Sequence, residues 1–181
     1  MIDPQSNKTT GFHLFFEPEG ILKDELAQII RNLDAEYDGP VFTPHVTLLA
    51  CIVPEVPDSV EGIIEKTEVL VKELHPFTLT LGTCAAQDAY YKALYIEIQE
   101  QKEMKALHAR ASEIFSMTDE SPYGAHLSLL YGNYPEEQKQ KTIESLILPV
   151  EHSFVVNHLY LYKTEGEVQD WELIKKFSIG D

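Results

Sequence analysis

The sequence is poor in basic residues. Only 14 of its 181 residues are lysine or arginine, against 30 aspartates and glutamates, which gives a formal net charge of −16. Such an acidic surface repels polyanions, so we expect no binding to long nucleic acid and none to an anionic membrane. The composition therefore favours a small substrate over a polymer.

Cysteines and long hydrophobic runs are also scarce. The two cysteines, Cys51 and Cys84, have no Cys-x-x-Cys spacing, so they indicate neither a disulfide framework nor a zinc site. The longest apolar run, over 48–53, is too short to cross a bilayer, and residues 1–10 lack the basic start and apolar core of a signal peptide. We therefore expect a soluble, cytoplasmic protein.

One short pattern, in contrast, occurs twice. His45 to Leu48 (HVTL) and His126 to Leu129 (HLSL) both consist of a histidine, an apolar residue, a hydroxyl residue and a leucine. Alternate side chains of a β-strand share a face, so each stretch predicts one imidazole beside one hydroxyl. A single copy has a structural explanation, because a half-buried strand tolerates a hydrogen-bonded histidine. Two matched copies are hard to attribute to chance.

Hydrophobic periodicity predicts strands and helices along the rest of the chain. Strand patterns alternate apolar and polar residues, whereas helix patterns repeat apolar residues every three or four positions. We predict strands over 12–16, 41–53, 77–82, 94–98, 126–131, 154–162 and 171–177, and helices from 21 to the stop at 38–40 and over 58–70, 101–115 and 135–147.

The order of these elements repeats: strand, helix, motif strand, helix, strand. His126 follows His45 by 81 residues, and Phe154 follows Phe77 by 77, a difference that one loop can absorb. This predicts an internal duplication of about eighty residues. We expect a single domain over 1–181 made of two lobes, about 11–83 and 88–181. Two repeats related by a rough twofold axis would bring the motif strands side by side at one cleft.

Two such histidines allow acid and base catalysis without a metal. Imidazole has an ordinary pKa near 6.5, so at neutral pH one ring can accept a proton while the other donates one. The neighbouring hydroxyls can donate hydrogen bonds to phosphoryl oxygens. In-line displacement at phosphorus needs the attacking and leaving oxygens on opposite sides, which two opposed histidines provide.

The paired motifs resemble the signature of the 2H phosphoesterases, a superfamily with one His-x-Thr/Ser-apolar motif in each lobe. The runs 39–47 (GPVFTPHVT) and 122–131 (PYGAHLSLLY) most resemble the cyclic phosphodiesterase branch known from plants and yeast. The resemblance extends over nearly the whole chain. It implies a bilobal α+β fold, with two antiparallel-rich sheets flanked by helices and a central cleft.

The resemblance also implies an activity: hydrolysis of ADP-ribose 1″,2″-cyclic phosphate or a nucleoside 2′,3′-cyclic phosphate to a monoester, with no cofactor and no metal. His45 and His126 would be the catalytic pair, with Thr47 and Ser128 binding the phosphate. The substrate-binding aromatics that it implies are Phe15, Tyr91 and Tyr131.

The three aromatics also have structural explanations. Phe15 and Tyr91 could serve as core residues. Tyr131 stands at an odd offset from His126, so it faces the cleft only if the strand twists or bulges there. The remaining histidines have no partner at ligand spacing, and among them His13 is best placed to line the cleft.

Two alternatives remain open. One is a 2H enzyme that acts on RNA ends or 2′,5′-linked oligonucleotides, against which the negative charge argues. The other is a non-catalytic nucleotide-binding module, although binding alone does not require histidine in both motifs. The sequence leaves the oligomeric state, the preferred nucleotide and the identity of the acid open.

Overall fold

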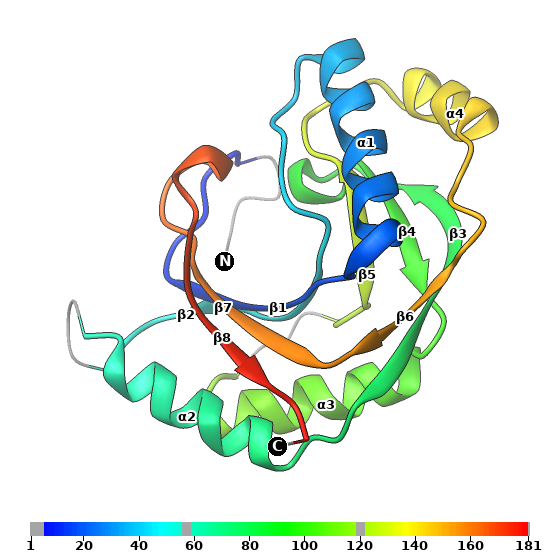
Figure 1. The fold of residues 1–181 in the computed structure, drawn as a ribbon. Helices are drawn as coiled ribbons and strands as arrows, with labels where there is room; N and C mark the ends of the chain where they lie inside the picture. Colours follow the sequence, from blue (N-terminus) through cyan, green and yellow to red (C-terminus); the bar gives the residue numbers. More distant parts are fainter. Residues whose placement is uncertain (1–5, 56–58, 119–121, 181) are drawn as a thin grey trace.

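The computed structural model of the protein describes residues 6–55, 59–118 and 122–180. Within these ranges the chain forms eight β-strands, four α-helices and two short 3-10 helices, Tyr90–Lys92 and Val168–Asp170 (Figure 1). The strands are β1 (Phe12–Phe16), β2 (Val46–Ile52), β3 (Phe77–Ala86), β4 (Leu94–Ile98), β5 (His126–Leu130), β6 (Ser153–Val156), β7 (His158–Lys163) and β8 (Glu172–Ser178). The helices are α1 (Gly20–Tyr37), α2 (Glu61–Lys72), α3 (Gln101–Ile114) and α4 (Glu136–Ser145).

Helix α1 shows how the sequence determines these elements. Its buried residues recur every three or four positions: Leu22, Leu26, Ile30 and Leu33. The helix ends at Asp38, which takes a left-handed conformation with φ of 55° and is followed by Gly39 and Pro40. None of the described helices combines the length and apolarity needed to cross a membrane.

The strands form one antiparallel sheet in the order β6-β3-β4-β5-β2-β1-β7-β8. The two motif strands, β2 and β5, are neighbours at its centre, where Val46 pairs with Leu127. The sheet curves strongly around its concave side (Figure 1). The predicted α+β class is confirmed, and the two expected sheets are the four-stranded halves of this one sheet, joined where β2 meets β5.

Two helices cover each half of the sheet. Helices α2 and α3 contact β8 and β2, whereas α1 and α4 contact β5 and β3, and Figure 1 shows the two pairs on different sides of the molecule. The two sequence halves therefore exchange elements, because α1 and β3 join the half with β4 and β5, and α3, β7 and β8 join the half with β1 and β2. The spatial halves do not coincide with residues 11–83 and 88–181. The sequence duplication itself stays a prediction.

Two predicted strands need correction. The strand expected over 41–53 begins only at Val46, because Pro44 has no N–H to donate to a neighbouring strand. The strand expected over 154–162 is two strands that separate at Asn157: β6 pairs with β3, and β7 pairs with β1 and β8. This segment crosses from one half of the sheet to the other, a change of partner that hydrophobic alternation does not reveal.

Two helix boundaries also differ from the prediction. Helix α4 ends at Ser145, and Ile147, expected on its apolar face, is 87% exposed. Helix α2 begins at Glu61. The expected cap at 58 lies outside the described residues.

Candidate functional site

The register of β2 and β5 brings the two motifs together. Because Val46 pairs with Leu127 in an antiparallel arrangement, continuing that register by one residue in each direction places His45 opposite Ser128 and Thr47 opposite His126. Val46 and Leu127 are fully buried, and side chains alternate along a strand. The two imidazoles and two hydroxyls therefore share the other face of the sheet, each histidine beside the hydroxyl of the other motif.

Both histidines are held by the same backbone contact. The Nδ1 atom of His45 lies 2.7 Å from the carbonyl oxygen of Thr43, and Nδ1 of His126 lies 2.8 Å from that of Gly124. A carbonyl oxygen only accepts, so each Nδ1 carries the hydrogen and donates it. In the neutral ring this leaves Nε2 unprotonated and able to accept a proton.

Burial favours the neutral form of both rings. Burial and, to a smaller extent, the positive charge of Lys92 lower the pKa of His126, the Gly124 carbonyl opposes them, and the net pKa is about 4. Burial also lowers the pKa of His45, whereas the Thr43 carbonyl and the negative charge of Glu17 raise it. In the free protein at neutral pH, both Nε2 atoms are therefore expected to be proton acceptors.

The two hydroxyls differ in their surroundings. Ser128 is buried, and its Oγ donates a hydrogen bond of 2.8 Å to the carbonyl oxygen of Tyr91. Thr47 is half-buried, and its backbone carbonyl accepts a hydrogen bond of 2.8 Å from the Tyr123 hydroxyl. These bonds tie β5 to the segment that carries Tyr91, and β2 to the residues that precede β5.

All three predicted aromatics lie at this site. The ring of Phe15 stacks on His45 with centroids 3.9 Å apart. The Tyr131 hydroxyl lies 3.4 Å from Nε2 of His45, and the Tyr91 ring meets that of Tyr131 edge to face at 5.0 Å. Tyr131 reaches the site because β5 ends at Leu130, so strand alternation no longer fixes its direction.

The sequence analysis assigns no role at the site to three of its residues. Trp171 lies 6.1 Å from the ring of Tyr91 and 6.2 Å from that of His45, and therefore contacts aromatics from both halves of the sheet. Phe42 stacks on Tyr131 at 3.8 Å with the planes only 9° apart. Glu17 stands in a run, 17–20 (EPEG), whose composition is typical of a turn. Trp171 is the sole tryptophan in the sequence, a signal that could have singled it out.

A small pocket of about 150 Å³ opens beside His45. Its lining residues are Phe15, Glu17, Val41, Phe42, Thr43, His45, Tyr162, Val168 and Trp171. Larger hollows exist, such as one of about 430 Å³ between α2 and β8, but that one contains none of the motif residues. The chemistry of the lining, rather than size, makes the pocket beside His45 the candidate site.

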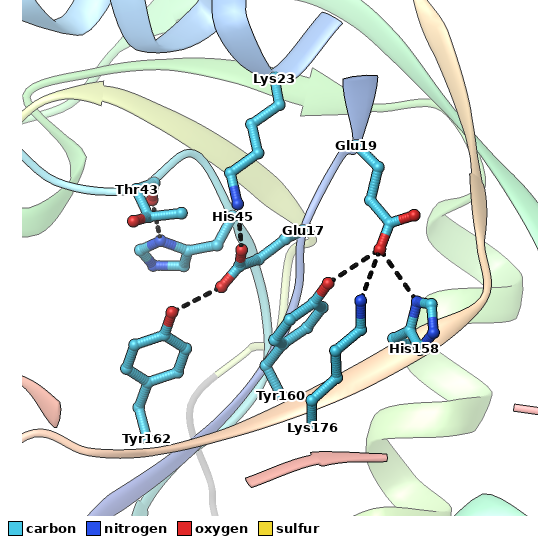
Figure 2. A network of polar contacts seen from close by, with 9 residues as sticks. All are labelled: Glu17, Glu19, Lys23, Thr43, His45, His158, Tyr160, Tyr162 and Lys176. Carbon is cyan, nitrogen blue, oxygen red and sulfur yellow. Dashed lines mark hydrogen bonds and ion pairs between the residues drawn. The ribbon is translucent and has the colours of Figure 1, made fainter. Parts of the chain in front are cut away.

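Two further histidines have structural partners. His13 is buried and hydrogen-bonded to the Thr164 hydroxyl, and its ring lies 5.7 Å from Phe15, so it lies at the edge of the site. His158 pairs with Glu19 at 3.0 Å (Figure 2). Across the described ranges, no three His, Cys, Asp or Glu side chains are arranged to hold a metal ion.

Comparisons with known proteins place the whole chain in one family. A family model described as cyclic phosphodiesterase-like protein matches residues 10–179. A cyclic phosphodiesterase from Arabidopsis thaliana is 25% identical over 166 residues, which cover 87% of this chain and 88% of that protein.

Solved structures share the architecture. The crystal structure of E. coli LigT complexed with 3′-AMP has a TM-score of 0.60 at 15% identity and covers 96% of this chain and 99% of LigT. LigT complexed with NADP+ has a TM-score of 0.56 at 16% identity and covers 97% and 100%. The protein TT0787 of Thermus thermophilus has a TM-score of 0.60 at 15% identity and covers 92% and 97%.

Proposed function

Since the chain belongs to the cyclic phosphodiesterase-like protein family, we propose that it hydrolyses ADP-ribose 1″,2″-cyclic phosphate, a nucleoside 2′,3′-cyclic phosphate, or both, to a monoester. The observation that carries the proposal is the cross-strand arrangement in which each histidine faces the hydroxyl of the other motif. A phosphoryl group placed there would meet a hydroxyl and an imidazole on each side.

His45 and His126 act as the acid and base pair in this proposal. One Nε2 takes a proton from the attacking water while the other gives a proton to the ribose oxygen that leaves phosphorus. Because Nδ1 of both rings is bonded to a backbone carbonyl, each Nε2 is the atom that exchanges the proton. No cofactor or metal takes part.

Thr47 and Ser128 hold the non-bridging oxygens of the phosphate. Ser128 has one hydroxyl hydrogen, which it gives to the Tyr91 carbonyl in the free protein. On substrate binding this hydrogen turns to a phosphoryl oxygen, and the Tyr91 carbonyl loses its donor. Binding is thereby coupled to the segment that carries Tyr91.

Aromatic residues bind the rest of the nucleotide. Phe15, Tyr91 and Tyr131 surround the motif residues, and aromatic faces stack favourably on nucleobases. E. coli LigT, which shares the fold, has been crystallised with 3′-AMP and with NADP+. These complexes support a nucleotide as the ligand.

The test is turnover of a panel of cyclic phosphates, with and without EDTA, and identification of the products by phosphorus NMR. We expect ring opening to one monoester at the same rate in the chelator. Loss of activity in EDTA would overturn the metal-free mechanism. Binding without turnover would favour a nucleotide-binding module, and a preference for oligonucleotides would favour an enzyme of RNA ends.

A further inference from the structure

The two motif histidines are matched at Nδ1 but differ in the charges around them. Each donates Nδ1–H to the carbonyl two residues before it. Glu17 acts on His45 with a negative charge, whereas Lys92 acts on His126 with a positive one. Neighbouring side chains therefore distinguish the two rings: a negative charge acts on His45 and a positive charge acts on His126.

Glu17 follows β1 directly and is set against His45. Phe15 pairs with Thr47 and Phe16 with Val46, so continuing this register by one residue places Glu17 opposite His45. Figure 2 shows its carboxylate beside the imidazole ring, and both residues line the same pocket. The side chain is only 2% exposed.

Two partners hold this buried carboxylate. Nζ of Lys23 lies 2.8 Å from one carboxylate oxygen, and the Tyr162 hydroxyl donates a hydrogen bond of 2.7 Å to the other (Figure 2). Such partners are what allow a carboxylate to be buried as an anion. The Lys23 side chain is 37% exposed, so water screens its charge more than that of Glu17. The net electrostatic effect of the Glu17–Lys23 pair on His45 is therefore that of a negative charge, which favours the protonated ring.

The other titratable groups that face His45 do not supply a negative charge. Burial lowers the pKa of His13 to about 3 and raises the pKa of Tyr131, so both are neutral at physiological pH. Burial also raises the pKa of Tyr162. His126 repels a proton on His45 when it is itself protonated. Among these titratable groups, Glu17 is therefore the one that favours a proton on His45.

Building on the proposed function, we infer that Glu17 is a positioning residue whose buried carboxylate stabilises the protonated imidazole of His45 and so makes His45 the proton donor. As the water oxygen bonds to phosphorus and the bond from phosphorus to the ribose oxygen breaks, His126 Nε2 takes the water proton. The proton on Nε2 of His45 passes to the ribose oxygen. A bound phosphate anion favours a proton on either ring, and Glu17 and Lys92 decide which ring holds it.

The direct test is an NMR titration of the imidazole nitrogens in the wild type and in Glu17→Gln, between about pH 3 and 8. We expect the pKa of His45 to fall by about 0.5 to 1 in the variant, because an opposite charge has been removed from its side, and that of His126 to stay within error. An unchanged pKa of His45, or an equal shift in the pKa of both rings, overturns the inference.

Glu19→Gln is the matched control. Glu19 lies two residues further along the chain, but its side chain is 45% exposed and faces His158, Tyr160 and Lys176 (Figure 2). The variant Glu19→Gln removes the same charge as Glu17→Gln and should leave the pKa of His45 unchanged. Lys23→Gln removes the counter-charge of Glu17 and should raise the pKa of His45, so it tests the sign independently of how well Glu17→Gln folds.

Kinetics connect the titration to turnover. A fall of about 0.5 to 1 in the pKa of His45 lowers the protonated fraction of this ring by about three- to tenfold. Glu17→Gln should therefore lower kcat at neutral pH by that factor. Glu17→Asp should recover part of the loss, and Glu19→Gln should stay within about twofold of the wild type. The titration needs no substrate. Failure of every cyclic phosphate to react would overturn the proposed function alone, whereas an active protein with an unshifted His45 would overturn only the role of Glu17.

Discussion

The ring of Phe15 lies on the imidazole of His45, with centroids 3.9 Å apart and planes inclined by 24°. Phe42 and Trp171 approach the same imidazole edge-on, each with a centroid 6.2 Å away. The ring is thus positioned by aromatic packing and by the Thr43 carbonyl at Nδ1. The same packing removes water from the ring, which is why burial is the largest influence on its pKa.

Phe15→Leu should therefore affect both stability and turnover. It removes the stacked face while keeping an apolar side chain, and we expect a loss of about 1 kcal/mol in the free energy of unfolding and about a tenfold fall in kcat. Phe12→Leu is the control, because Phe12 is a buried aromatic of the same strand at an odd offset from Phe15. Urea melts and steady-state kinetics measure the two effects. An equal loss of turnover in both variants would show that the contact with His45 is irrelevant.

His45→Ala and His126→Ala should each lower kcat by about two to four orders of magnitude, because each removes a proton-transfer group. His152→Ala provides the comparison, since His152 is an exposed histidine outside the site. Circular dichroism and thermal melting establish that the variants are folded. Near-normal turnover in either motif variant would exclude the two-histidine mechanism.

Thr47→Ala and Ser128→Ala should each cost about 2.7 to 4 kcal/mol in the transition state, because each removes a donor to a phosphoryl oxygen. Ser128→Ala also leaves the partly buried Tyr91 carbonyl without its hydroxyl donor, so we expect it to lower the free energy of unfolding more than Thr47→Ala does. The two readouts are kcat/KM and urea denaturation. Unchanged kcat/KM in both variants would mean that other groups hold the phosphate.

The sequence predicted the elements of this site better than their spatial arrangement. The paired motifs identified the four polar side chains, because a repeated chemical pattern does not depend on the fold around it. The location of β3 and β7 in the sheet half opposite their own part of the sequence could not be predicted, since alternation reports that a strand is half-buried but not which strand it pairs with.

Glu17 illustrates the same limit at the level of one residue. Within Glu17-Pro18-Glu19-Gly20 its sequence context is that of an exposed turn. Its burial and its proximity to His45 arise from strand pairing and from Lys23 and Tyr162, which lie 6 and 145 residues away along the chain. A buried charge with long-range partners leaves no local signal.

Stability should fall in acid because the neutral form of His13 is buried. Its pKa is about 3 in the folded protein, below the value near 6.5 expected for the unfolded chain, so between these values the unfolded state binds more protons. The free energy of unfolding is then lost as pH falls through this window, by up to about 1.4 kcal/mol per pH unit for this one group. Urea denaturation at several pH values in the wild type and in His13→Asn measures the change in slope. His152→Asn should keep the wild-type slope, and an equal slope in all three proteins would contradict the burial of neutral His13.

Substrate size should matter because of the net charge of −16. A polyanion that approaches this surface meets a repulsive field whose reach is about 8 Å at physiological salt, so each added phosphate should slow association. A cyclic mononucleotide or ADP-ribose cyclic phosphate carries few charges and can be bound by two hydroxyls, one charged imidazole and an aromatic face. We therefore expect kcat/KM to fall from such a substrate to an RNA oligomer that ends in a 2′,3′-cyclic phosphate. The deficit should shrink as salt is raised, because salt screens the repulsion. Measuring both substrates across a salt series decides the matter: if the oligomer is the better substrate at low salt, basic groups must line its path, and the protein is an enzyme of RNA ends.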